Sequence, residues 1–250
     1  MSTDVTVYDA AAQRWLRFSE PVELLIAQRE DQVLDVIDEV ESRTSQDGLY
    51  AAGFLTYEAS PGIAPELATH SSRGPLPPGW FALYRRALFS EALPFAAGDC
   101  LDGWSATVTR DDYDSAIARI RNYIEAGDTY QVNYSFRLRA RLKFSPADLF
   151  AHMVGSQGPG LAAFIETPEF AIASASHELF FSRDGTQLVS RPMKGTAPRG
   201  LRDGTDRAQA EWLAGSAKNR AENLMITDMV RNDLGRIAEI GSVVAADLFA

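Results

Sequence analysis

Two stretches in the second half of the chain place polar residues where they could do chemistry. The first, at 191–200, reads RPMKGTAPRG, so Lys194 and Thr196 lie among prolines and glycines that restrict the backbone. A lysine amine can serve as a nucleophile, and it can equally be a solvated surface charge. The second stretch, 216–234, places Glu222 beside the apolar residues of an expected helix. A carboxylate at that border can face either a binding site or solvent.

Gln131 and Asn133 offer a different chemistry. They belong to a segment, 131–142, in which apolar and polar residues alternate, and both lie on its polar side. Alternation over this length predicts a long, half-exposed strand. The two amides can therefore hydrogen-bond a polar ligand, or they can simply form the solvent side of that strand.

The common catalytic and nucleotide-binding signatures are absent. The sequence contains no glycine-rich dinucleotide fingerprint, no P-loop, no G-x-S-x-G and no H-E-x-x-H. Its three histidines, His70, His152 and His177, are scattered along the chain. Histidine-dependent hydrolysis and a histidine zinc site are therefore disfavoured, and the residue patterns alone indicate an anionic-ligand site without naming a reaction.

The composition excludes several classes of protein. The 250 residues are 46% hydrophobic and carry a formal net charge of −10, which argues against a disordered chain and against a binder of polyanions. We expect no nucleic-acid partner. No apolar run is long enough to span a bilayer and the N-terminus does not read as a signal peptide, so we expect no membrane partner. The single cysteine, Cys100, fits a reducing compartment, and we expect a cytoplasmic protein.

Periodicity and capping residues predict the elements that must position these residues. One predicted helix contains Val33–Val40, and a second runs from Thr109 to Gly127. Two more begin at Ser145 and at Thr205. The last predicted helix has an apolar face formed by Ala221, Leu224, Met225 and Met229. The predicted strands are Leu49–Tyr57, Trp80–Phe89, 131–142 and several short strands within Ala162–Arg191, with a hairpin turn at Asp184-Gly185. A breaker-rich loop covers 61–79.

Runs of strands interrupted by helices, without regular βαβ alternation, predict the α+β class. We expect stacked antiparallel β-sheets with flanking helices. Residues 1–100 should form an N-terminal region that packs on a second region, 101–250, within one body.

Four motifs, taken in order, resemble the chorismate-utilising enzymes, a family that includes the large subunits of aminodeoxychorismate synthase and anthranilate synthase. The motifs are EAGDTYQVNYS from residue 125, SHELF from 176, RPMKGTAPRG from 191 and KNRAENLMITDMVRNDLGR from 218. The earlier segments FSEPVELL and GFLTYEA resemble the N-terminal region of short bacterial members. The resemblance implies the family's fold, incomplete at the C-terminus because the later catalytic motifs do not occur in these residues.

The resemblance also implies roles for individual residues. Family members that aminate chorismate to aminodeoxychorismate carry Lys before Gly-Thr, where anthranilate and isochorismate synthases carry Ala, and this sequence has Lys194. By that match Lys194 is the nucleophile, Glu178 the general acid and Glu222 a ligand of Mg²⁺. The implied substrate-binding residues are Gly195, Thr196, Gln131 and Asn133.

The implied activity is amination of chorismate at C4 for p-aminobenzoate and folate synthesis, with ammonia from a separate glutamine amidotransferase subunit. Two alternatives remain: a non-catalytic truncated chain that at most binds the amidotransferase, and the sibling anthranilate synthase. We expect the 250 residues alone to show no turnover, and we expect no tryptophan site. The sequence departs from the family pattern at Ala175-Ser176-His177, before the glutamate, and at Asn219, where several relatives carry an acidic residue.

Overall fold

The computed structural model describes residues 3–70, 74–93, 102–246 and 248. The chain divides into two compact units, Met1–Ala175 and Ser176–Ala250, and each is described by itself. The predicted boundary between residues 100 and 101 lies outside the described residues and stays a prediction. Among the helices that the structure describes, none has both the length and the apolar character needed to cross a lipid bilayer.

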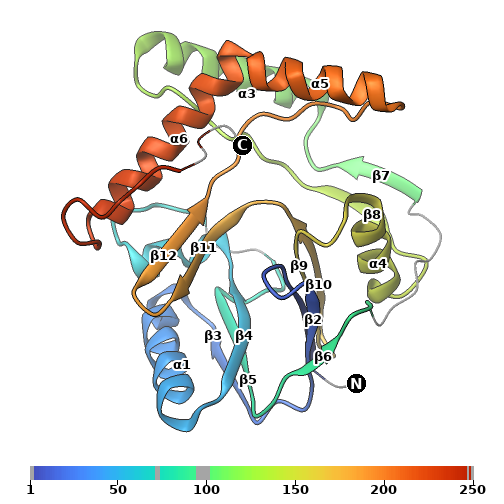
Figure 1. The fold of residues 1–250 in the computed structure, drawn as a ribbon, viewed down its shortest axis with the longest axis vertical. Helices are drawn as coiled ribbons and strands as arrows, with labels where there is room; N and C mark the ends of the chain where they lie inside the picture. Colours follow the sequence, from blue (N-terminus) through green and yellow to red (C-terminus); the bar gives the residue numbers. More distant parts are fainter. Residues whose placement is uncertain (1–2, 71–73, 94–101, 247, 249–250) are drawn as a thin grey trace. The chain divides into compact units, whose positions relative to one another are not determined.

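Two antiparallel sheets form the centre of the first unit (Figure 1). The larger sheet has the strand order β10-β9-β1-β2-β6, with bounds Ala171–Ser176, Leu161–Glu166, Asp4–Asp9, Arg14–Phe18 and Leu88–Ser90. The smaller sheet has the order β3-β5-β4, with bounds Glu23–Ala27, Gly79–Tyr84 and Tyr50–Leu55. β1 pairs antiparallel with both β2 and β9, and the second pairing joins residues 4–7 to residues 163–166.

The core of this unit is layered. Val5 and Ile165 of the larger sheet pack against Trp80 and Tyr84 of the smaller sheet, and these side chains are buried. On its other face, the larger sheet buries Phe164 against the helix α4 (Pro146–Gln157). The smaller sheet is covered by α1 (Val33–Asp47). Because side chains alternate between the faces of a strand, each sheet contributes to two of these layers.

The bounds of α3 and the start of α4 lie where the local signals predict, whereas the helix predicted from Thr205 begins two residues earlier, at Asp203. α3 (Arg110–Ala126) is capped by Thr109, whose hydroxyl accepts a hydrogen bond from Asp112 N–H at 3.1 Å, and it ends at Gly127 with φ +80°. Ser145 caps α4 in the same way, and Pro146 occupies its first turn. Short 3-10 helices, Glu30–Gln32 and Tyr57–Ala59, and α2 (Ser60–Ile63) complete this part of the unit.

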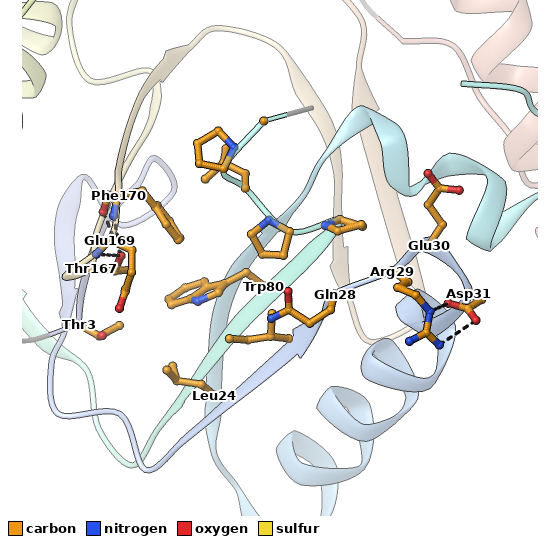
Figure 2. Close-up of a pocket in the computed structure, with 16 residues that line it drawn as sticks. Thr3, Leu24, Gln28, Arg29, Glu30, Asp31, Trp80, Thr167, Glu169 and Phe170 are labelled. Atoms are coloured by element: carbon orange, nitrogen blue, oxygen red, sulfur yellow. Dashed lines mark hydrogen bonds and ion pairs between the residues drawn. The ribbon is translucent and has the colours of Figure 1, made fainter. Parts of the chain in front are cut away.

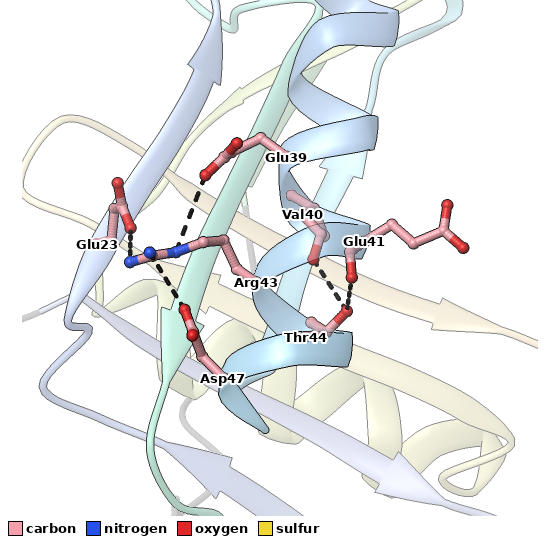
Figure 3. Close-up of polar contacts among 7 residues, drawn as sticks. All are labelled: Glu23, Glu39, Val40, Glu41, Arg43, Thr44 and Asp47. Atoms are coloured by element: carbon pink, nitrogen blue, oxygen red, sulfur yellow. Dashed lines mark hydrogen bonds and ion pairs between the residues drawn. The ribbon is translucent and has the colours of Figure 1, made fainter.

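An ion-pair network joins α1 to the smaller sheet (Figure 3). Arg43 on α1 reaches Glu23 on β3 at 2.7 Å and Asp47, one turn further along the helix, at 3.1 Å. Glu39 lies one turn earlier, at 3.9 Å. The Arg43 side chain is 38% exposed, so solvent screens these pairs only in part.

Two strand predictions are wrong in their extent. The segment 131–142 forms a strand only as β8, Leu138–Arg141, which pairs with β7, Asp102–Ala106. Just before β8, Thr107 N–H still donates to the Arg137 carbonyl at 2.9 Å, but Arg137 N–H donates to the Thr107 hydroxyl at 3.1 Å instead of to a backbone carbonyl. Alternation shows which side chains share a face, but a strand also needs a neighbour for its backbone hydrogen bonds.

The predicted strand Trp80–Phe89 is two strands in different sheets. β5 ends at Tyr84 in the smaller sheet, and β6 begins at Leu88 beside β2 in the larger one. A continuous apolar run does not show where the pairing partner changes, and this is why the sequence pattern missed the break.

The second unit contains a two-stranded ribbon and two helices. β11 (Leu179–Asp184) pairs with β12 (Gln187–Arg191), and the turn between them contains Gly185 with φ +56°. α5 (Asp203–Gly215) and α6 (Ala217–Gly235) follow. No residue among those described in this unit is buried. The predicted apolar face of α6 is only partly covered: Leu224 is 51% and Met229 48% accessible, Ala221 is exposed and Met225 is half-buried.

Candidate active site

The segment that carries Lys194 begins where β12 ends, at Arg191, and has no regular secondary structure. Glu178, just before β11, reaches across to it, because Glu178 Oε1 accepts a hydrogen bond from Met193 N–H at 3.1 Å. Ser176 in turn accepts from Glu178 N–H at 3.1 Å. The carboxylate of Glu178, the predicted general acid, therefore binds the backbone of Met193, the residue before Lys194, the predicted nucleophile.

Gly195 fixes the middle of the segment against α6. Its φ is +83°, a conformation that favours glycine, and a Cβ there would lie 3.1 Å from the Cβ of Asn219. Asn219 belongs to the first turn of α6, which Ser216 caps by accepting from Asn219 N–H at 3.4 Å. Lys194 and Thr196 are thus held on either side of a glycine that abuts a capped helix.

A third contact holds the far end of the segment on α5. The Arg199 guanidinium donates two hydrogen bonds, both 2.7 Å long, to the two carboxylate oxygens of Asp206. Gly200 N–H donates to Asp206 Oδ1 at 2.9 Å. Hydrogen bonds from Arg199 and then from Gly200 lower the pKa of Asp206 below its usual value. Sequence reasoning missed Asp206, because no local spacing rule links it to an arginine seven residues earlier.

Lys194 itself is half-buried, and no hydrogen bond or ion pair of its side chain is found among the described residues. Thr196 is exposed. A half-buried amine on a restrained backbone, without a bound partner, can act as a nucleophile, which requires the neutral form and a free lone pair.

Glu222 lies on α6, one turn after Lys218, and the two side chains form an ion pair at 3.8 Å. The Glu222 side chain is 29% exposed. The described residues contain no cluster of three or more His, Cys, Asp or Glu side chains arranged to hold a metal. A single carboxylate oxygen fits Mg²⁺, which keeps several water ligands and takes substrate oxygens, and it does not fit a closed structural metal site.

Gln131 and Asn133 belong to the first unit, in the irregular stretch before β8. Gln131 is half-buried and Asn133 is exposed. Thr129 donates a hydrogen bond to the Gln131 carbonyl at 3.2 Å. Their predicted role in binding substrate stays a prediction.

The first unit also contains a cavity of about 910 Å³ that no sequence motif indicated (Figure 2). Trp80 and Phe170 form apolar parts of its wall, together with prolines of the loop before β5. At its edge Arg29 and Asp31 form an ion pair at 3.0 Å. The cavity is built from residues far apart in the sequence, so only the folded chain reveals it.

Comparison with known proteins defines the class of this protein. Residues 93–250 match the family of chorismate binding enzymes. Because this match covers more than half of the chain, the chain belongs to that family. The solved structure of a putative 2,3-dihydroxybenzoate-specific isochorismate synthase, DhbC from Bacillus anthracis, superposes with a TM-score of 0.70 at 16% identity. The superposition covers 94% of this chain and 60% of that one, and it confirms the α+β fold of antiparallel sheets and helices.

The proteins with similar sequences are named for two different activities. Aminodeoxychorismate synthase component 1 of Escherichia coli is 39% identical over 146 residues, which are 58% of this chain and 32% of that protein. The protein of the same name from Bacillus subtilis is 36% identical over 160 residues, 64% of this chain and 33% of that protein. Anthranilate synthase component 1 of Pseudomonas aeruginosa is 36% identical over 138 residues, 55% of this chain and 28% of that protein. The chain thus spans about a third of the length of the curated relatives it matches.

Proposed function

We propose that this chain is part of the large component of an aminodeoxychorismate synthase, which aminates chorismate at C4. The observation that carries the proposal is Lys194: it precedes Gly195-Thr196 in a backbone segment that is held by contacts on three sides. Similarity to relatives with this printed activity supports it. Anthranilate synthases are similar to this chain to nearly the same degree. Lys194 is therefore the feature that favours aminodeoxychorismate synthase over anthranilate synthase.

The proposed reaction uses two allylic displacements. The neutral Lys194 amine attacks ring C2, the ring double bond shifts, and the C4 hydroxyl leaves as water after Glu178 donates a proton. Ammonia then attacks C4, the double bond shifts back, and the Lys194 amine leaves from C2. Chorismate and ammonia thus give 4-amino-4-deoxychorismate and water, and covalent catalysis divides one difficult substitution into two easier steps.

In this proposal Glu222 holds a Mg²⁺ ion, and Gly195, Thr196, Gln131 and Asn133 bind the substrate. The ion would supply positive charge beside the substrate carboxylate. The Glu222 carboxylate and the Lys218 amine form an ion pair at 3.8 Å along α6, so the two side chains share one side of the helix. Ammonia would come from a separate glutamine amidotransferase subunit, and the product would serve p-aminobenzoate and folate synthesis in the cytoplasm.

The test uses the protein from the complete reading frame that contains these residues, supplied with chorismate, Mg²⁺ and ammonium. We expect 4-amino-4-deoxychorismate, identified by chromatography and mass, and no product when glutamine replaces ammonium. Lys194→Ala should abolish product formation while chorismate binding remains, and Lys194→Arg should not restore it because a guanidinium stays protonated. Lys143→Ala is the matched control, since the chain has only three lysines. Anthranilate as the product, or normal turnover by Lys194→Ala, would contradict the proposal.

The role of Glu222 has its own test. Glu222→Gln should raise the Mg²⁺ concentration that gives half-maximal activity by about tenfold or more, because a neutral amide is a weaker ligand for a hard cation. Lys218→Ala breaks the same ion pair but keeps the carboxylate, so it should not raise that concentration. An equal effect of both substitutions would show that the ion pair matters and that Glu222 does not bind the metal.

A further inference from the structure

We propose that Asp206 is a positioning residue that holds the segment 194–200 on α5, and so fixes where the Lys194 amine lies. The inference rests on the proposed function of Lys194, because only a reacting amine needs this placement. It assigns a role to a residue on a different element from the predicted catalytic groups.

The contacts of Asp206 are more extensive than those of an ordinary surface ion pair. Both of its carboxylate oxygens accept from Arg199 at 2.7 Å, and Oδ1 also accepts from the Gly200 backbone at 2.9 Å. The Asp206 side chain is 28% exposed. A bidentate arginine pair combined with a bond to a backbone N–H has a defined geometry, whereas isolated exposed pairs are mobile and contribute little.

Gly200 shows that the backbone itself approaches α5 closely. A Cβ at this position would overlap the backbone of Thr205 and Asp206. Only glycine allows this approach, and it brings the Gly200 N–H within reach of the Asp206 carboxylate. The first turn of α5 is fixed in turn, because Arg202 N–H donates to the Thr205 hydroxyl at 3.1 Å.

The backbone is therefore held on both sides of Lys194. Before it, Met193 N–H donates to Glu178. After it, Gly195 abuts Asn219 of α6, and Gly200 is bound to Asp206 of α5. Pro198 restricts the backbone between them. Without the Asp206 contact, Gly195 is the one contact named here that still holds the backbone after Lys194. A displacement of about 1 Å in a reacting group can lower a rate by about 100-fold.

Three variants test this assignment. Asp206→Asn keeps the size of the side chain but removes the charge that pairs with Arg199. Arg199→Ala removes the ion pair and leaves the bond to Gly200, so it is the milder variant if Asp206→Asn folds poorly. Asp203→Asn is the matched control, because Asp203 is an exposed acid in the same first turn of α5 and no contact of its side chain is found among the described residues.

The first measurement is hydrogen–deuterium exchange by mass spectrometry on the 250-residue chain, in peptides that cover 192–201. We expect Asp206→Asn to raise exchange in these peptides by about fivefold or more, while Asp203→Asn leaves it unchanged. Peptides from β11 and β12 should not change in either variant. Unchanged exchange over 192–201 in both Asp206→Asn and Arg199→Ala would overturn the inference.

The second measurement is steady-state kinetics of the protein from the complete reading frame. Asp206→Asn should lower kcat by about 10- to 100-fold with a nearly unchanged KM for chorismate. Arg199→Lys, which keeps the positive charge, should lose less activity than Arg199→Ala. A loss in KM alone, or equal loss in Asp203→Asn, would contradict the positioning role. If the wild-type protein forms no aminodeoxychorismate but the exchange difference persists, the proposed function fails and the structural role of Asp206 stands.

Discussion

The two units of this chain are stabilised in different ways. In the first unit, side chains such as Phe164 and Tyr84 are fully buried between layers. In the second unit no described residue is buried, and the segment that carries Lys194 is held by hydrogen bonds, one ion pair and closely packed glycines. The scaffold therefore depends on apolar burial, whereas the candidate site depends on polar contacts whose geometry is specific.

This difference has a functional consequence. Apolar burial is non-directional, whereas a hydrogen bond requires a defined distance and angle between its donor and its acceptor. The rate of reaction depends on the precise position of the nucleophile, and it depends less on the stability of the segment that carries the nucleophile. Substitutions in the first unit should therefore change unfolding, and substitutions around Lys194 should change activity and local exchange.

The largest expected effect on stability comes from Phe150 on α4. Its ring is fully buried, stacks on Phe164 with centroids 5.2 Å apart and meets Trp15 edge-on at 5.9 Å. Phe150→Ala should reduce the free energy of unfolding by about 3–5 kcal/mol, as large-to-small core changes do. Urea denaturation followed by tryptophan fluorescence measures this, because Trp15 reports on the same cluster.

The matched control for Phe150 is Phe180 in the second unit, which is 84% exposed. Phe180→Ala should change the free energy of unfolding by less than about 0.5 kcal/mol. A comparable loss in both variants would contradict the contrast between the two units.

Tyr84 tests the same contrast between the two units with a substitution that should stabilise the first unit. Its ring is fully buried, but its hydroxyl has no hydrogen-bond partner among the described residues. Tyr84→Phe should increase the free energy of unfolding by about 1 kcal/mol, because it removes an unsatisfied buried group. Tyr57→Phe, at an 81% exposed position, is the control and should change nothing.

The same residue predicts a dependence on pH. Burial, and then the charge of Asp4, raise the pKa of Tyr84 above its ordinary value. The unfolded chain releases this proton near pH 10, before the folded chain does, so the stability contribution is complete below about pH 10 and is lost as the pH rises further. Denaturation midpoints measured from pH 8 to 11 should therefore fall more steeply for the wild type than for Tyr84→Phe. Parallel curves would refute this.

A smaller effect is expected at Arg43, the polar contact that joins α1 to the smaller sheet (Figure 3). Arg43→Met should cost about 0.5–1 kcal/mol, and the difference from the wild type should shrink in 1 M salt, because these pairs are partly screened. Arg110→Met removes a more exposed helix pair with Asp114 and should cost less. A salt-independent loss at Arg43 would indicate packing of its aliphatic stem instead.

The smallest effect is expected at Leu201, which is fully exposed after the lysine segment. Leu201→Ser should leave the free energy of unfolding unchanged within about 0.5 kcal/mol. A loss above 1 kcal/mol, measured at two protein concentrations, would show that this side chain is covered in solution.

Local signals predicted several elements of the fold correctly. Thr109 and Gly127 mark the ends of α3, and Ser145 marks the start of α4, because capping involves groups within a few residues of each other. The family and the segments of the candidate site were also predicted from sequence motifs, and the family match confirms the first of these. The roles of Lys194, Glu178 and Glu222 stay predictions.

The sequence by itself determined both ends of α3, the start of α4, and to which family the chain belongs. Only the tertiary structure decided that β1 pairs with β9, that the run after Trp80 divides between two sheets, and that Asp206 binds the end of the lysine segment. The physical reason is the distance along the chain over which each interaction acts. Caps and periodicity act over one or two turns of chain, whereas strand pairing and the contacts of Arg199 and Gly200 require partners that folding brings together.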